Sequence, residues 1–244
     1  MPLAVRELAV RRMLFSDHAS RRAFRRAYGA EGSEAIPLRL RALGGDPIWV
    51  RPGHSDLFVL REAFTYKDAL PPRGCTPNRI FDVGANIGAT MALLAAALPD
   101  AEIVGFEPDP GTAELCRRNV ERWKGRCQVV QAALFTEDGD VRLAGDWKAG
   151  LQVSDDNAGI SVPAISLPTA LERYGDVDYL KLDVEGAEAR LLARPAGWER
   201  VACVNVEVHA PYETERCARD LTALGFDVAL ERGPREPRVV GRRR

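Results

Sequence analysis

The spacing of apolar residues divides the chain near residue 79, where short apolar runs begin to alternate with helix-like segments. Apolar runs that are bounded by turn residues predict buried strands. Such runs occupy residues 79–83, 102–106, 127–133, 178–184, 201–208 and 226–230, and residues 238–240 are suited to an antiparallel hairpin at the sheet edge. The polar residues 144–159 are expected to be irregular. Alternating strands and helices predict an α/β fold, with a Rossmann-like, doubly wound, mostly parallel sheet.

The N-terminal part differs from this pattern. Residues 1–43 are expected to be helical, because isolated apolar residues are spaced among arginines there. Another helix is expected at residues 57–64, and either Ser55 or Asp56 would serve as its N-cap. We therefore expect an N-terminal helical extension with a lid or cap segment at residues 1–74, followed by a ligand-binding domain at residues 75–244.

Charge and cysteine content narrow the range of partners. The formal net charge is −1, so the whole protein is not expected to bind nucleic acid. Arginines are concentrated in residues 1–28 and in the C-terminal tail, where we expect a solvated surface, with peripheral contact to an anionic membrane as the alternative. No apolar run could span a bilayer and no secretory signal is evident. Five cysteines without a C-x-x-C pair favour a reduced, cytoplasmic protein.

The first core strand ends in the pattern Asp82-x-Gly84-x-Asn86-x-Gly88, directly before an Ala/Leu-rich helix. Glycines at a helix N-terminus let a ligand approach bare backbone, although they can also serve only to pack the helix against the sheet. The pattern is not G-x-G-x-x-G, and Asp82 would be a poor neighbour for a pyrophosphate. Glu107 ends the second strand about twenty residues later, where a carboxylate would hold a ribose diol or merely flank the next helix. S-adenosylmethionine, with its ammonium group and ribose, fits these residues better than NAD.

Several longer segments carry a resemblance to a known family. They are residues 81–88, 105–110, 131–134, 178–188 and 205–209, and Asp183-Val184-Glu185-Gly186-Ala187-Glu188 is the most specific part. In this order and spacing they resemble the FkbM family of class I S-adenosylmethionine-dependent methyltransferases. The resemblance implies the class I methyltransferase fold, with a seven-stranded, mostly parallel sheet, and assigns residues 75–244 to the methyltransferase domain.

The resemblance also implies roles in binding S-adenosylmethionine. Gly84, Asn86 and Gly88 would shape the loop under its methionine part, Asp82 would act on its amino group directly or through water, and Glu107 would hold its ribose. The implied cofactor-binding residues are Asp56, Asp82, Gly84, Ala85, Asn86, Gly88, Glu107, Pro108, Gln131, Ala132, Ala133 and Asp183. Residues 131–133 would line the adenine, and Asp183 would lie nearest the methyl group.

Methyl transfer to a hydroxyl needs a group that accepts the hydroxyl proton. The candidates are Asp183, Glu185, Glu207 and His209, which end or follow predicted strands, although His209 could instead be held structurally. No resident metal is predicted. The alternative is that Asp183, Glu185 and Glu207 bind a divalent metal that polarises a sugar diol.

The sequence therefore predicts an S-adenosylmethionine-dependent O-methyltransferase. Its acceptor would be a hydroxyl on a sugar, a glycan or a natural product, so the expected partner is a small molecule or a carbohydrate. One alternative is a non-catalytic cofactor-binding or scaffold protein whose arginine-rich ends contact a partner or a membrane. A less favoured alternative is an NAD-dependent oxidoreductase.

Overall fold

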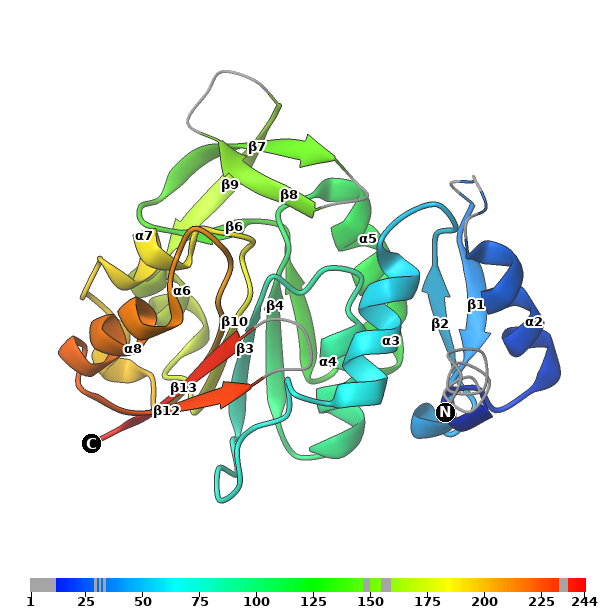
Figure 1. The fold of residues 1–244 in the computed structure, drawn as a ribbon, viewed down its shortest axis with the longest axis horizontal. Helices are drawn as coiled ribbons and strands as arrows, with labels where there is room; N and C mark the ends of the chain where they lie inside the picture. The colour runs from blue at the N-terminus through cyan, green and yellow to red at the C-terminus, as the bar shows by residue number, and fades with distance from the viewer. Residues whose placement is uncertain are drawn as a thin grey trace.

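The computed structural model describes residues 12–146 apart from residues 29, 31 and 33, and residues 150–154, 159–232 and 237–244. A seven-stranded sheet lies at its centre, with the order β12-β13-β11-β10-β3-β4-β5 (Figure 1). The strands are β3 Arg79–Val83, β4 Glu102–Phe106, β5 Cys127–Val130, β10 Tyr179–Leu182, β11 Cys203–Glu207, β12 Phe226–Arg232 and β13 Pro237–Arg243. All pairs are parallel except those that β13 makes with β11 and β12. The predicted α/β fold with a seven-stranded sheet is confirmed.

The C-terminal hairpin is present, but its second strand does not lie at the sheet edge. β13 pairs with β11 on one side and with β12 on the other, which makes β12 the edge strand. Val239 and Val240 of β13 are buried, whereas Leu230 of β12 is 58% exposed. The inner position therefore goes to the strand whose apolar side chains are covered on both faces.

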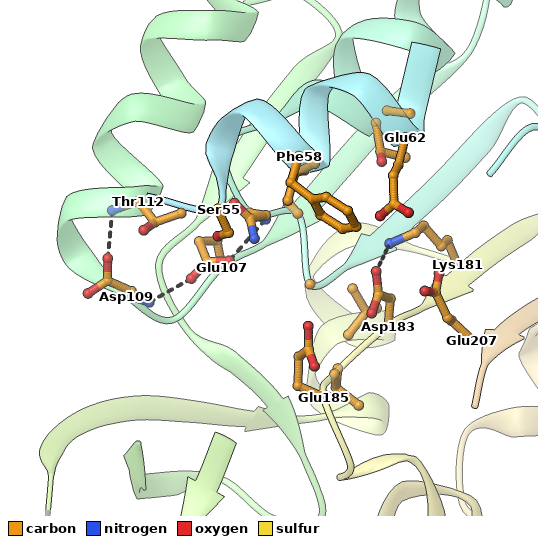
Figure 2. A pocket seen from close by; sticks show the side chains of 18 of the residues that line it. Ser55, Phe58, Glu62, Glu107, Asp109, Thr112, Lys181, Asp183, Glu185 and Glu207 are labelled. Carbon is orange, nitrogen blue, oxygen red and sulfur yellow. Dashed lines mark hydrogen bonds and ion pairs between the residues drawn. The ribbon is translucent and has the colours of Figure 1, made fainter. Parts of the chain in front are cut away.

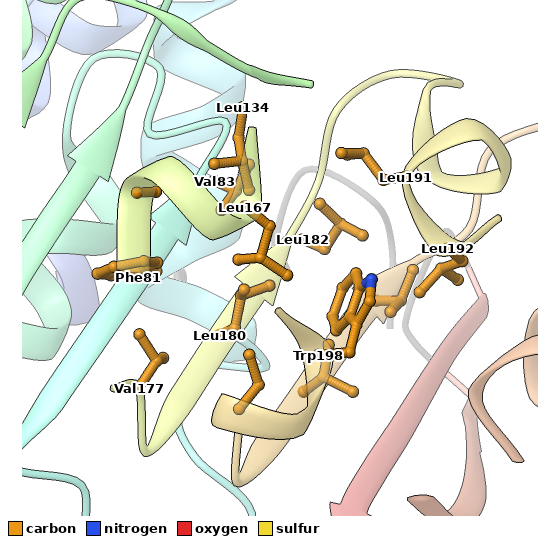
Figure 3. Packing of buried hydrophobic residues seen from close by; sticks show 14 of the residues in the cluster. Phe81, Val83, Leu134, Leu167, Val177, Leu180, Leu182, Leu191, Leu192 and Trp198 are labelled. Carbon is orange, nitrogen blue, oxygen red and sulfur yellow. The ribbon is translucent and has the colours of Figure 1, made fainter. Parts of the chain in front are cut away.

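Successive side chains of each strand point to opposite faces of the sheet, and each face has its own helices. The helices are α4 Ala89–Ala97, α5 Pro110–Val120, α6 Leu167–Tyr174, α7 Glu188–Leu192 and α8 Thr214–Ala223. Phe81 and Leu180 face α6, α7 and α8 and pack in one cluster with Trp198 (Figure 3). Their neighbours Ile80 and Tyr179 pack on the other face, in a cluster with residues of α4 and α5. The strand periodicity thus explains why both faces are covered.

The N-terminal part is only partly helical, which corrects the expectation for residues 1–43. The described elements include α2 His18–Ala27, β1 Ile36–Arg39, the short 3-10 helix η1 Arg41–Leu43 and β2 Pro47–Val50. The two strands form a small antiparallel sheet (Figure 1). Leu38 and Leu40 are buried while Arg39 between them is exposed, which is the two-residue period of a strand. Residues 1–11 lie outside the described part of the chain.

Helix α3 Asp56–Tyr66 connects this part to the core. Ser55 precedes the helix, but its side chain makes no capping hydrogen bond to a described residue, and Asp56 does not cap either. Instead, the carboxylate of Asp56 accepts hydrogen bonds from the backbone N–H of Arg51 at 2.8 Å and from its Nε at 2.9 Å. Apolar side chains of α2, β1, β2, α3 and α4 form one cluster, so the N-terminal part packs on the core. Among the described helices, none has the length and apolarity needed to cross a membrane.

A second sheet lies beside the carboxyl ends of the central strands (Figure 1). It consists of β6 Ala133–Phe135, β7 Gly139–Asp146, β8 Gly150–Ser154 and β9 Ile160–Ser166, in the order β6-β9-β7-β8. Two expectations are therefore wrong: residues 127–133 are not one strand, and most described residues of 144–159 are not irregular. The N–H of Ala132 donates to the carbonyl of Val130 at 3.0 Å, and this tight turn sends the chain into the second sheet. The rest of the stretch, residues 147–149 and 155–158, lies outside the described residues.

Candidate functional site

A cavity of about 840 Å³ opens at the carboxyl ends of β3, β4, β10 and β11, beneath α3. The strand order reverses between β3 and β10, which is where open α/β sheets bind ligands. The predicted site residues that line it are Gly84, Ala85, Asn86, Glu107, Pro108, Ala133, Asp183, Glu185, Glu207 and His209. The fold thus brings together the ends of strands that are far apart in the sequence.

The other predicted cofactor residues lie outside the lining of this cavity. Asp56 is buried against Arg51, which itself lines the cavity. Asp82 is buried one layer behind it, and Gly88 is the N-cap residue of α4. Ala132 is buried in the turn after β5, so Ala133 and Leu134 are the residues of that segment that reach the cavity. The role assigned to Gln131, which precedes them, stays a prediction.

Gly84 is required by the close approach of two strand ends. Its φ is +84°, and a Cβ on it would lie 1.8 Å from the carbonyl oxygen of Asp183. The N–H groups of Gly84 and Ala85 both donate to the carbonyl of Phe106 at 3.0 Å, which holds the loop between β4 and β10. The glycine is therefore explained by backbone packing as well as by access for a ligand.

We expect Gly84→Ala to lower the free energy of unfolding by roughly 1–3 kcal/mol from the positive φ alone, and by more if the strand ends must separate. Urea unfolding followed by circular dichroism measures this. Gly125→Ala is the matched control, because no atom lies within 4 Å of a Cβ at that position. Equal stability of the two variants would contradict the packing role of Gly84.

Glu107 is held by the backbone at the edge of the cavity. Its Oε2 accepts the N–H of Asn86 at 2.9 Å, and its Oε1 accepts the N–H of Asp109 at 2.9 Å (Figure 2). Burial raises the pKa of Glu107 to about 7, against the lowering effect of these two hydrogen bonds. Each carboxylate oxygen keeps a second lone pair, so the group can still accept hydrogen bonds from a pair of hydroxyls.

Lys181 is buried and lines the cavity, and it was not among the predicted site residues. Its Nζ donates to Oδ2 of Asp183 at 2.8 Å (Figure 2). The same Nζ lies 3.7 Å from Oδ1 of Asp82. Neither carboxylate oxygen of Asp82 has a hydrogen-bond partner among the described residues. Burial raises the pKa of Asp82 to about 6, whereas Lys181 and His209 hold the pKa of Asp183 below its ordinary value despite burial. One ammonium group therefore faces the fully buried carboxylate of Asp82 and the partly exposed carboxylate of Asp183.

The other acid–base groups surround His209. Its Nδ1 lies 2.7 Å from Oε1 of the fully buried Glu188, and its Nε2 lies 3.6 Å from Oδ1 of Asp183 and 3.7 Å from Oε2 of Glu185. Burial alone would lower the pKa of His209, but these carboxylates raise it to about 9. Burial and the charge of Asp183 raise the pKa of Glu207 to about 8. Proton acceptors of different basicity thus share one wall of the cavity.

Sequence reasoning found the strand-end acids but missed the groups that position them. The sequence does contain an indication of Lys181, because this cation interrupts the apolar run Tyr179–Leu182. In an extended strand, residues two apart point to the same side, so Lys181 is expected on the same side as Asp183. Glu188 belongs to the segment used for the family resemblance, yet its contact with His209 depends on how β11 and α7 meet in space. Phe58 of α3 also lines the cavity, and nothing in the local sequence indicates that.

Comparisons with known proteins identify several methyltransferases that are similar to this chain. A release factor glutamine methyltransferase from Geobacter sulfurreducens is 28% identical over 58% of this chain and only 46% of its own length, so this chain spans about half of that relative. The 31-O-demethyl-FK506 methyltransferase FkbM from Streptomyces tacrolimicus is 28% identical over 64% of this chain and 75% of its own. The hexuronic acid methyltransferase AglP from Haloferax volcanii is 26% identical over 67% of this chain and 70% of its own.

A solved structure and a family model complete the comparison. A candidate O-methyltransferase from Nostoc punctiforme PCC 73102 superposes with a TM-score of 0.50 at 14% identity, over 78% of this chain and 58% of that one. It shares the fold of class I methyltransferases. The model of the methyltransferase FkbM domain matches residues 82–228, which run from the end of β3 into β12 and include the strand ends that form the cavity. A match over more than half of the chain means that this protein belongs to the FkbM methyltransferase family.

Proposed function

We propose that this protein is an S-adenosylmethionine-dependent O-methyltransferase that acts on a hydroxyl of a sugar, a glycan or a natural product. The observation that carries the proposal is the arrangement of one cavity. Glu107, with its two backbone N–H contacts, lies at one end, and Lys181, Asp183, Glu207 and His209 lie at the other. A volume of about 840 Å³ suits a nucleoside cofactor and a small acceptor together.

The residues of this chain fit S-adenosylmethionine. The free lone pairs of Glu107 suit the two ribose hydroxyls, and the loop through Gly84 and Ala85 exposes backbone beside them. When bound, the cofactor supplies a methyl group that is activated by a sulfonium centre. Phe58 of α3 lies over the space between Glu107 and Asp183, where it can exclude water (Figure 2).

The protein's own part in the chemistry is to orient the acceptor hydroxyl and take its proton. Asp183 is kept ionised by Lys181 and is suited to hold the hydroxyl. Glu207 lies beside Lys181, and its pKa of about 8 suits a general base near neutral pH (Figure 2). The names of two relatives support the acceptor class, since one is named for a demethylated natural product and the other for a hexuronic acid.

Calorimetric titration of the purified protein with S-adenosylmethionine, S-adenosylhomocysteine and NAD tests the cofactor. Tighter binding of NAD than of either sulfur compound would overturn the proposal. A library of hydroxylated acceptors, assayed by mass spectrometry for a gain of one methyl group, tests the reaction. Cofactor binding without turnover on any acceptor would instead favour the non-catalytic alternative.

The affinity for S-adenosylhomocysteine is expected to rise about tenfold between pH 6 and pH 8. A ribose diol donates to the ionised form of Glu107, whose pKa is about 7 in the empty cavity, so binding at pH 6 must first remove a proton. Calorimetry at pH 6 in two buffers with different ionisation enthalpies should therefore detect release of about one proton per ligand. Affinity that is constant over this range would contradict the assignment of Glu107 to the ribose.

A further inference from the structure

The imidazole of His209 is fixed by a buried carboxylate. Oε1 of Glu188 faces Nδ1 at 2.7 Å and also accepts the N–H groups of Val184 at 3.3 Å and Gly186 at 3.2 Å. Glu188 has no exposed surface, so this contact cannot exchange with water. Because Oε1 of Glu188 already accepts two backbone N–H groups, Nδ1 is assigned as the donor in this contact, and Nε2 faces the carboxylates of Asp183 and Glu185 in the cavity. A histidine whose Nδ1–H is held by a carboxylate is the usual arrangement behind a metal-binding Nε2.

Nε2 faces two carboxylate oxygens at distances too long for hydrogen bonds. Oδ1 of Asp183 lies at 3.6 Å and Oε2 of Glu185 at 3.7 Å. The three ligand atoms all lie within 4.8 Å of one another. Atoms about 2.1 Å from a shared divalent ion are about 3 Å apart when octahedral and about 3.4 Å apart when tetrahedral, so a small contraction completes the site.

The contacts of the two acids leave the required oxygens available. Nζ of Lys181 donates a hydrogen bond to Oδ2 of Asp183 at 2.8 Å, so the other oxygen, Oδ1, is the one that faces Nε2 of His209. Glu185 has a φ of +52°, a conformation that non-glycine residues rarely adopt, and its Oε2 also faces Nε2 of His209. All three residues line the cavity, so an ion between them is open to a ligand there.

We propose that Asp183, Glu185 and His209 bind a divalent first-row metal ion that holds two neighbouring oxygens of the acceptor. Two carboxylates and one imidazole suit ions such as Mn²⁺, Fe²⁺ or Co²⁺. An octahedral ion takes six ligands, so about three positions remain for the acceptor and water. The preferred acceptor is then a vicinal diol or a hydroxy acid. This inference rests on the proposed function. It differs from the metal site considered from the sequence, Asp183, Glu185 and Glu207, because His209 takes the place of Glu207 as the third ligand.

The transfer step balances without a further reagent. The ion draws electron density from the acceptor hydroxyl, whose proton passes to the carboxylate of Glu207 and then to solvent. The oxygen's electron pair forms the new bond to the methyl carbon while the carbon–sulfur bond breaks. That bond's electron pair stays on sulfur, so the sulfonium becomes the neutral thioether of S-adenosylhomocysteine.

Titration of the chelator-treated protein with MnCl₂ alone, followed by the electron paramagnetic resonance signal of free Mn²⁺, tests the site. We expect about one bound ion per chain. His209→Ala and Glu185→Gln should each weaken binding at least tenfold. Glu188→Gln, which changes the group behind His209 and keeps an oxygen acceptor for the N–H groups of Val184 and Gly186, should weaken it about 10- to 100-fold. Thermal melts by circular dichroism check that each variant is folded. Glu185 lies at the surface of the cavity, so its variant is expected to fold even if His209→Ala does not.

Glu207→Gln is the matched control, because Glu207 lines the same wall but is not in the ligand set. It should bind Mn²⁺ as tightly as the wild type. The proposal is overturned if the wild type shows no saturable Mn²⁺ binding, or if Glu207→Gln abolishes it while Glu185→Gln and His209→Ala do not. Binding of S-adenosylhomocysteine, measured separately, distinguishes the two failures. A protein that binds the cofactor but no Mn²⁺ loses only the metal site. A protein that binds Mn²⁺ but no cofactor keeps the metal site, but loses the methyltransferase proposal and with it the role of the ion in holding the acceptor.

Discussion

The Glu107→Gln variant is expected to bind S-adenosylmethionine at least 100-fold more weakly than the wild type. The carboxylate is the group at this end of the cavity that can accept both hydroxyls of a ribose, and hydrogen bonds to a charged group contribute about 1.5–3 kcal/mol each. Loss of the pair corresponds to about 3 kcal/mol or more, which is a factor of about 100 in affinity. Isothermal titration calorimetry at pH 8, where Glu107 is mostly ionised, measures the difference.

Glutamine is preferred to alanine because it preserves an acceptor for one of the two backbone N–H groups. An alanine would leave the N–H groups of Asn86 and Asp109 without this partner, and the loop could move for that reason alone. Glu102→Gln is the control, since Glu102 begins the same strand, pairs with Arg79 and is exposed. Unchanged affinity in Glu107→Gln would remove Glu107 from the ribose, and an equal loss in Glu102→Gln would point to a general effect of the lost charge.

The central sheet was predictable because its signals are local. Each buried strand is a short apolar run, and the residue that ends the run marks the edge where parallel strands meet. For this reason Asp183, Glu107 and Glu207 could be assigned to one edge from the sequence. The loop through Gly84 was predictable for the same reason, although its closest contact, the carbonyl of Asp183, comes from a strand about a hundred residues away.

The parts that were missed depend on contacts between distant segments. Polar residues of β7 and β8 alternate with apolar ones along an antiparallel hairpin, and so weak a pattern does not distinguish a strand from irregular structure. The strand β1 follows an arginine-rich helix, and it becomes clear only when Leu38 and Leu40 are seen to be buried in the cluster that also holds side chains of α2, α3 and α4. Within the site, the positions of Lys181 and Glu188 follow from charges that meet only after folding. Where local propensity does not determine the secondary structure or the side-chain contacts, tertiary packing determines them.

Lys181→Met is expected to lower the free energy of unfolding at pH 8 by about 3–5 kcal/mol, which is the usual cost of removing one partner of a buried ion pair. Methionine fills a similar space but leaves Asp82 and Asp183 facing each other without the ammonium group between them. Asp82 has no hydrogen bond to a described residue that could take its place. Urea unfolding at pH 8 measures the loss, and Lys124→Met, which removes an exposed lysine that pairs with Glu121, should leave the stability unchanged.

The same variant should recover stability as the pH falls from 8 to 5.5, which separates the charge from the lost packing. Burial already raises the pKa of Asp82 to about 6, and loss of Lys181 raises it further. A carboxyl group whose pKa is higher in the folded than in the unfolded state binds more protons when folded, so the fold gains stability as the pH falls through that pKa. The deficit relative to the wild type should therefore shrink at pH 5.5, and Asp82→Asn combined with Lys181→Met should be more stable at pH 8 than Lys181→Met alone. A deficit that stays the same at both pH values and in the double variant would mean that Lys181 stabilises the site by packing and not by its charge.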